Sequence, residues 1–212
     1  MVRFPAWRKV PEFTVFASLL RMTTKYGLSD VRDQLVDGIK GAYPTKWEGL
    51  GIGMVLGEDV FGSPKPHPNA VLNLFAEQGV KFALPFAAYQ VALAGFSSLT
   101  SDEPGTVLPR LTLASTVYGM EILRVGLFHL AHLVTRNMSS GACRNTACAE
   151  GANKVYDAMI KERKGGMLVS LSLGDVCVDC AKAAETAYQL WCTTVWEELP
   201  RIFRVGKSWE EL

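Results

Sequence analysis

Apolar residues recur every three to four positions along most of this chain, the spacing that gathers them on one face of an α-helix. The first such run extends from Glu12 to Thr24 and Gly27 ends it. A second begins at Ser29, which we expect to be its N-cap, and Tyr43-Pro44 closes it. The two predicted buried stripes are Val15, Phe16, Leu19 and Leu20, then Val31, Leu35, Val36 and Ile39.

Helical spacing returns further along the chain. Two short helices are predicted near Pro68–Gln78 and Pro85–Gly95, and the longest periodic run covers 109–136. We expect this run to be a central helix buried on much of its surface. Its apolar residues are Leu113, Val117, Met120, Leu123, Leu127, Leu130 and Val134.

The last third predicts two more helices, 152–160 and Cys180–Leu199. Only one segment, MLVSLSL at 167–173, has the character of a strand. The sequence therefore predicts a mainly α protein, an irregular multi-helix domain with a long central helix and a Gly/Pro-rich connector.

The connector is the stretch 45–67, which contains GLGIGMVLGEDVFGSPKPHP. Its glycines and prolines discourage a stable helix. It separates a helix pair at 1–44 from a C-terminal helical domain at 68–212, and all three parts could pack as one unit. A phosphate-binding loop is not indicated, because no strand–turn–helix context or Lys-Ser/Thr pair accompanies the glycines.

Charge and hydropathy narrow the classes of function. The 22 Lys and Arg residues nearly balance the 21 Asp and Glu residues, which argues against a nucleic-acid partner. Residues 82–101 carry no charge and are long enough to cross a bilayer, but Pro85, Gln90 and several serines favour a buried core helix. We therefore expect no membrane partner. Without a secretory signal at its start, the chain is predicted to be intracellular, in cytoplasm or nucleus.

Four of the five cysteines form two close pairs. Cys143 and Cys148 are spaced C-x4-C, and Cys177 and Cys180 are spaced C-x2-C. Four thiolates in two pairs are what tetrahedral zinc requires, and both pairs stand at predicted helix starts, where the helix dipole favours a thiolate. A structural zinc held by Cys143, Cys148, Cys177 and Cys180 is the favoured interpretation. Free structural thiols, and disulfide or redox pairs, remain alternatives. Cys192 lies on an apolar helix face and is predicted to be a core residue.

No catalytic residue is predicted. His129 and His132 lie one turn apart on the long helix and could replace a cysteine ligand, but structural histidines are the more common finding there. Any of the cysteines could meet His67, His129 or His132 in space, so a cysteine nucleophile stays open. The motifs G-x-S-x-G and H-E-x-x-H do not occur.

Several stretches resemble one family in their order along the chain. They are VFASLLRMTTKYGLSDVRDQLVDGIKGAYPTKWE, PHPNAVLNLFAEQGVKFALPFAAYQVA, the late C-x2-C before WEELPRIF, and the final SWEEL. Together they resemble the helical region that closes and follows the BTB/POZ domain in fungal BTB-domain proteins. Only about ten residues precede the first predicted helix. The mixed strand–helix BTB core is therefore expected to be absent.

The resemblance implies a non-catalytic protein-interaction or scaffold module. Proteins of this family dimerise and bridge cullin-type ubiquitin ligases or transcription complexes to other proteins, so protein partners, including cullin-type ligase components, are implied. Because the missing core normally carries those surfaces, the post-BTB helices would act alone. The alternative from another class is a small intracellular enzyme that uses a cysteine nucleophile or a metal.

Overall fold

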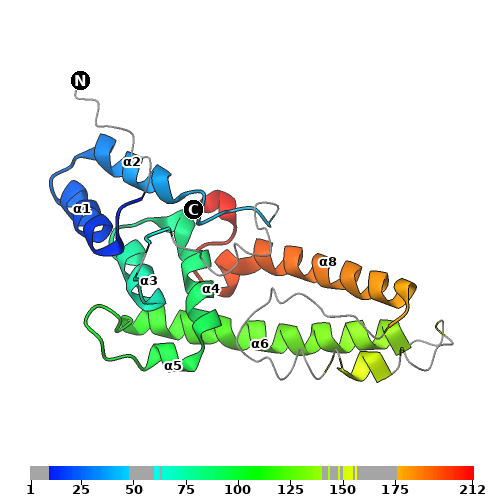
Figure 1. Ribbon diagram of the computed structural model, residues 1–212. Helices are drawn as coiled ribbons and strands as arrows, with labels where there is room; N and C mark the ends of the chain where they lie inside the picture. The colour runs from blue at the N-terminus through cyan, green and yellow to red at the C-terminus, as the bar shows by residue number, and fades with distance from the viewer. Residues whose placement is uncertain are drawn as a thin grey trace.

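The regular structure is helical wherever the chain is described. The structure is a computed structural model that describes residues 10–47, 60–62, 64–139, 143, 148, 150–154, 156 and 176–212, and the statements below concern these residues (Figure 1). This confirms the predicted mainly α class. Its elements are α1 (Phe13–Lys25), α2 (Ser29–Ile39), α3 (Pro68–Glu77), η3 (Lys81–Ala83), α4 (Leu84–Ala94), α5 (Phe96–Leu99), α6 (Arg110–Ser139), α8 (Val178–Ile202) and η4 (Trp209–Glu211).

Helix α4 lies at the centre of the main core. Its Phe86, Tyr89 and Val91 are completely buried, which confirms a core helix for the Leu84–Ala94 part of the apolar segment 82–101. It ends at Gly95, whose φ of +80° lies in a region that L side chains rarely adopt. Residues from both sides of the expected connector join the same core, among them Phe16, Leu20, Ile39, Phe75, Phe86, Trp196 and Phe203.

Local chemistry explains where α3 begins. Pro68 occupies the first helical turn, where its missing N–H costs no hydrogen bond. The preceding residue, His67, caps the helix because its Nδ1 accepts a hydrogen bond from the backbone N–H of Asn69 at 3.2 Å. The amide of Asn69 in turn donates to the carbonyls of Ser98 and Thr106, at 2.7 and 2.9 Å, and so attaches the segment before α6 to α3.

Helices α6 and α8 form an arm that extends away from the main core (Figure 1). They run antiparallel: Phe203, just after α8, packs at Gly119 near the start of α6, and Trp191 packs at Gly126 further along. A second, smaller core fills the arm and contains Leu130, Cys148, Ala152, Cys180, Ala184, Tyr188 and Cys192. The end of α6 and the start of α8 thereby meet at the far end of the arm.

Helix α6 is less buried than predicted. Its neighbours α4 and α8 cover one side, so Met120, Leu123 and Leu130 are buried while Leu111 and Val125 are exposed. Residues Arg110–Leu133 are long and apolar enough to cross a membrane, and only 22% of the most apolar part of this segment is buried. The prediction of a helix buried on much of its surface was therefore wrong.

The other predicted helices occur with small shifts. Ser29 was predicted to be the N-cap of the second helix, but the N-cap is Leu28, whose side chain makes no capping hydrogen bond, and Ser29 is the first helical residue. The candidate strand at 167–173, the end of the predicted helix 152–160 and most of the connector 45–67 lie outside the described residues.

Candidate metal centre

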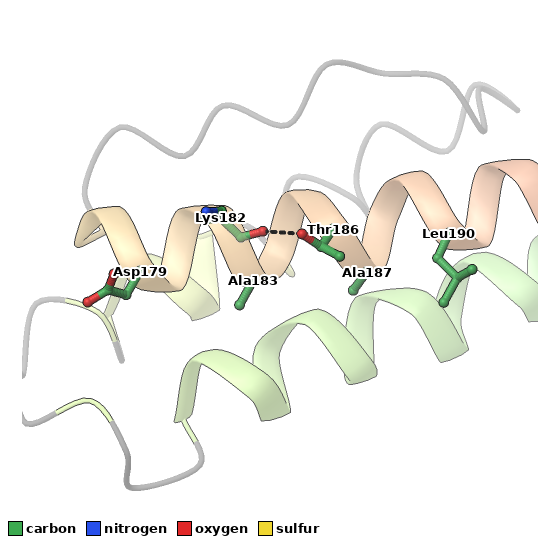
Figure 2. A pocket seen from close by; sticks show the side chains of 6 residues that line it. All are labelled: Asp179, Lys182, Ala183, Thr186, Ala187 and Leu190. Atoms are coloured by element: carbon green, nitrogen blue, oxygen red, sulfur yellow. Dashed lines mark hydrogen bonds between the residues drawn. The ribbon is translucent and has the colours of Figure 1, made fainter. Parts of the chain in front are cut away.

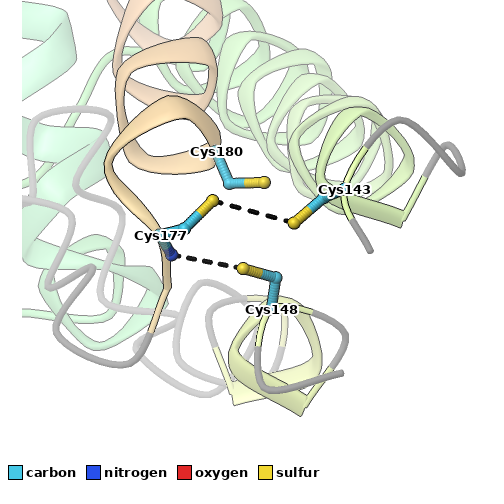
Figure 3. A group of neighbouring side chains, drawn as sticks. All are labelled: Cys143, Cys148, Cys177 and Cys180. Carbon is cyan, nitrogen blue, oxygen red and sulfur yellow. Dashed lines mark hydrogen bonds between the residues drawn. The ribbon is translucent and has the colours of Figure 1, made fainter. Parts of the chain in front are cut away.

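The four predicted cysteines meet at the far end of the arm (Figure 3). Cys143 follows the C-terminal end of α6, and Cys148 already has helical conformation. Cys177 is the N-cap of α8, and Cys180 lies in the first turn of that helix. The prediction that Cys180 opens the helix was therefore two residues late, because α8 begins at Val178. The helix begins directly after Cys177 because the backbone of Cys177 is extended, with ψ of 158°.

The sulfur atoms have the separation that a tetrahedral metal requires. All four Sγ atoms lie within 4.8 Å of one another, and those of Cys143 and Cys177 are 3.7 Å apart. Metal–sulfur distances of about 2.3 Å give a regular tetrahedron with edges of roughly 3.8 Å. A disulfide would need about 2.05 Å between sulfurs, and the four cysteines of the cluster are free thiols. The cluster can therefore hold a metal ion.

Backbone N–H groups stabilise negative charge on the sulfurs. The N–H of Cys177 donates to Sγ of Cys148 at 3.2 Å, as Figure 3 shows. The pKa of Cys177 is lowered to about 7, first by a hydrogen bond from the backbone of Cys180 and then by the neighbouring thiols. The N-terminal end of α8 adds the partial positive charge of its dipole. Of the three cluster cysteines whose pKa is shifted, Cys177 is thus the first to become a thiolate.

The other two shifted cysteines keep their protons longer. The side chain of Cys177 and burial raise the pKa of Cys180 to about 12. For Cys148 the backbone N–H of Cys177 lowers the pKa, but burial and the neighbouring thiols outweigh it and the pKa is raised. Several adjacent thiolates repel one another unless a cation lies between them. A bound metal ion would replace these protons and remove that repulsion.

Burial indicates what kind of metal chemistry the centre suits. Cys148 and Cys180 are buried, and Cys143 and Cys177 are half-buried. Four sulfur ligands would fill a tetrahedral coordination sphere and leave no position for a water nucleophile.

The remaining candidates do not join the cluster. Cys192 is 1% exposed and belongs to the small core of the arm, which confirms that prediction. Burial raises the pKa of its thiol to about 12. His129 and His132 are exposed on α6, and within the described part of the chain the metal-binding group contains only the four cysteines.

A shallow hollow of about 470 Å³ follows α8 beside the cluster (Figure 2). Alanines and Leu190 form its floor, and Asp179 and Lys182 provide its charges. The Oγ1 of Thr186 donates to the carbonyl of Lys182 within the helix, so this hydroxyl is already used. No nucleophile–base pair faces this hollow among its six lining residues.

Fold and site together define the class of this protein as a helical domain whose two-helix arm closes on a four-cysteine group able to hold a metal ion. No family model matches the chain. No curated protein and no solved structure shows significant similarity to it. The likeness to post-BTB helices rests on the sequence motifs and remains a prediction.

Proposed function

We propose that this chain is a non-catalytic protein-interaction module whose arm is closed by a structural zinc ion. The observation that carries the proposal is the convergence of four cysteine sulfurs, all within 4.8 Å of one another, from Cys143 to Cys180, which are 37 residues apart in the sequence. Zinc is the metal most often held by four thiolates in tetrahedral geometry.

The size of the arm supports a structural role for the metal. Its core contains few large side chains, and three of the seven buried members are cysteines. Zinc binding contributes ~10–16 kcal/mol in small finger peptides, compared with the ~5–15 kcal/mol that stabilises a whole domain. Zinc would therefore be sufficient to hold the end of α6 against the start of α8.

The interaction role is supported by resemblance and by surface. The post-BTB likeness implies intracellular protein partners, with cullin-type ligase components among them. The near balance of 22 basic and 21 acidic residues gives no reason to add a nucleic-acid partner. Several large apolar side chains are exposed on α6, and such surfaces on folded proteins commonly contact other proteins.

The rival function is an intracellular enzyme that uses Cys177 as a nucleophile. The lowered pKa of this thiol favours it. However, a nucleophilic cysteine needs a base or an oxyanion-binding group beside it. Among the described side chains, His67 caps α3 and no hydrogen bond joins His129 or His132 to the cluster.

Metal analysis of the purified chain separates the two functions. We expect one zinc per chain, protection of four cysteines from alkylation, and loss of helicity when a strong chelator removes the metal. Cys192→Ala is the matched control and should retain one zinc, because Cys192 is not a member of the four-cysteine metal-binding group. A metal-free protein in which only Cys177 reacts rapidly would overturn the proposal in favour of the enzyme.

A further inference from the structure

A groove lies in the main body, away from the cysteine cluster. Its walls are α3, α4 and the first turns of α6, together with the residues that follow α8, and its volume is about 370 Å³. The lining is largely apolar, with Leu72, Leu84, Leu111 and Phe203 among its members. The guanidinium of Arg204 is the one charged group in this lining.

The groove continues along α6 as an apolar stripe. Leu111, Tyr118, Ile122 and Val125 are 85%, 42%, 39% and 42% exposed. Their spacing of seven, four and three residues places them on one side of the helix. At 1.5 Å per residue this stripe is about 21 Å long, the length of four helical turns.

Arg204 has an unusual backbone conformation. Its φ of 55° lies in the left-handed region, where no other non-glycine residue falls in the described part of the chain. It follows α8 as part of a Schellman motif, in which the N–H of Val205 donates to the carbonyl of Pro200 and that of Arg204 to Arg201. Glycine is the usual residue at this position, so an arginine there indicates a use for its side chain.

That side chain is held at the edge of the groove. The guanidinium carbon of Arg204 lies 3.9 Å from the centre of the Tyr118 ring, on the apolar stripe. Arg110 is also exposed, at the N-terminal end of α6 beside Leu111. Within the described chain neither arginine forms an ion pair with a carboxylate.

We propose that the groove and stripe bind an amphipathic α-helix of a partner protein, with apolar residues at i, i+3, i+4 and i+7 and an acidic residue opposite Arg204. This deepens the proposed interaction function by naming its surface and the chemistry of its partner. The stripe has the length and spacing that a helix-in-groove contact needs. Charge complementarity favours an acidic partner, because the lining contributes only positive charge.

Two other occupants fit less well. A second copy of the chain would bring the same arginines against each other, and like charges oppose such pairing. A lipid surface is flat, whereas Leu72, Leu84 and Phe203 line a concave site between helices.

A displayed library of 16-residue peptides, selected on the full chain, tests the proposal. We expect enriched peptides to combine helical apolar spacing with Asp or Glu. A synthetic peptide from this set should bind the Leu111→Glu and Arg204→Glu variants at least tenfold more weakly than it binds the wild type, as measured by fluorescence anisotropy. Leu190→Glu is the matched control, because Leu190 is a 69% exposed leucine on α8 outside the groove. The Leu190→Glu variant should bind the peptide with the same affinity as the wild type.

Three outcomes would overturn the docking site: selected peptides that are basic or bind all variants equally, dimerisation of the wild type that Leu111→Glu abolishes, and Leu111-dependent binding to vesicles containing phosphatidylserine. Circular dichroism and zinc content of every variant show that it is folded. The two proposals fail separately, because zinc can be present without peptide binding and peptide binding can occur without zinc.

Discussion

The ring of Phe203 lies directly on the backbone of α6 at Gly119. A Cβ atom added to this glycine would lie 2.3 Å from Cε1 of Phe203, closer than any real contact. Phe203 is completely buried in the main core, so its ring has little room to move. This contact sets how closely the end of α8 approaches the beginning of α6, and the arm extends from that point.

Gly119→Ala should destabilise the protein. Alanine favours a helix over glycine by about 1 kcal/mol, but overpacking against a buried ring costs about 1–3 kcal/mol. The clash is with an aromatic ring at 2.3 Å, so we expect the overpacking to outweigh the gain in helix propensity. The free energy of unfolding should fall by about 1–2 kcal/mol. Urea unfolding followed by circular dichroism measures this difference.

Gly126→Ala is the matched control in the same helix. Its added Cβ would lie 3.4 Å from the Trp191 ring, a tight but tolerable contact. The helix-propensity gain should then dominate, with stability unchanged or raised by up to about 1 kcal/mol. If the two alanine variants had equal stability, the packing of Phe203 on Gly119 would not be limiting.

Replacement of Arg204 by glycine should leave the fold intact or stabilise it. Left-handed backbone costs an L-residue roughly 1–2 kcal/mol, whereas an exposed cation–π contact contributes about 0.5–1 kcal/mol. We therefore expect Arg204→Gly to raise the free energy of unfolding slightly, by about 0.5 kcal/mol. Arg204→Ala retains the strained Cβ and should be less stable than Arg204→Gly. The reverse order in urea unfolding would contradict the assignment of strain at this position.

Much of the fold could be predicted from the local spacing of apolar residues and from the positions of proline and glycine. Predicted helices at Pro68–Gln78 and Pro85–Gly95 correspond to α3 (Pro68–Glu77) and α4 (Leu84–Ala94), because proline and glycine mark their ends chemically. The convergence of the cysteines was also predictable, since two close pairs are common in metal sites.

Long-range packing could not be predicted in the same way. Apolar spacing on 109–136 indicated a helix, but whether Val117 and Leu111 face a neighbour depends on where α4 and α8 lie. Those positions are set by contacts such as Phe203 on Gly119, between residues 84 apart in the sequence. The left-handed Arg204 likewise gave no sequence signal, because glycine is the residue normally expected there.

Loss of one cluster cysteine should loosen the arm before the body. We expect Cys177→Ser to lower zinc content below one per chain and to speed amide exchange at the start of α8. Amides of α4 should remain protected, because α4 belongs to the main core. Hydrogen exchange with mass spectrometry resolves the two regions. Uniform exchange across both would show that the cluster and the body unfold as one unit.

The thiols of the metal-free protein should titrate in a fixed order. The backbone N–H of Cys180, followed by neighbouring thiols, lowers the pKa of Cys177 to about 7, compared with about 8.5 for an ordinary cysteine. Alkylation of Cys177 by iodoacetamide should therefore reach half its maximal rate near pH 7. Cys180, with a pKa raised to about 12, should stay slow through pH 9. Zinc binding must displace these protons, so its affinity should fall as the pH falls, and more steeply below pH 7, where Cys177 is protonated as well.

The same asparagine chemistry occurs twice on α3, at different depths. Asn69 is fully buried and its amide donates to the carbonyls of Ser98 and Thr106. One turn later, Asn73 is half-buried and donates to the carbonyls of Gly105 and Val107, at 2.9 and 3.0 Å. Both side chains hold the segment that leads into α6.

Asn69→Asp should therefore be much more harmful than Asn73→Asp. Aspartate has nearly the same shape but no amide donor, so an ionised carboxylate at position 69 would face two carbonyl oxygens without access to water. We expect the free energy of unfolding to fall by about 3 kcal/mol or more for Asn69→Asp. For Asn73→Asp it should fall by about 1 kcal/mol, because water can replace the lost hydrogen bonds there. Urea unfolding at pH 7 measures both. The loss of stability in Asn69→Asp should become smaller as acid protonates the aspartate, because the neutral carboxyl group can donate one hydrogen bond. Equal losses of stability at the two positions would contradict the role of burial.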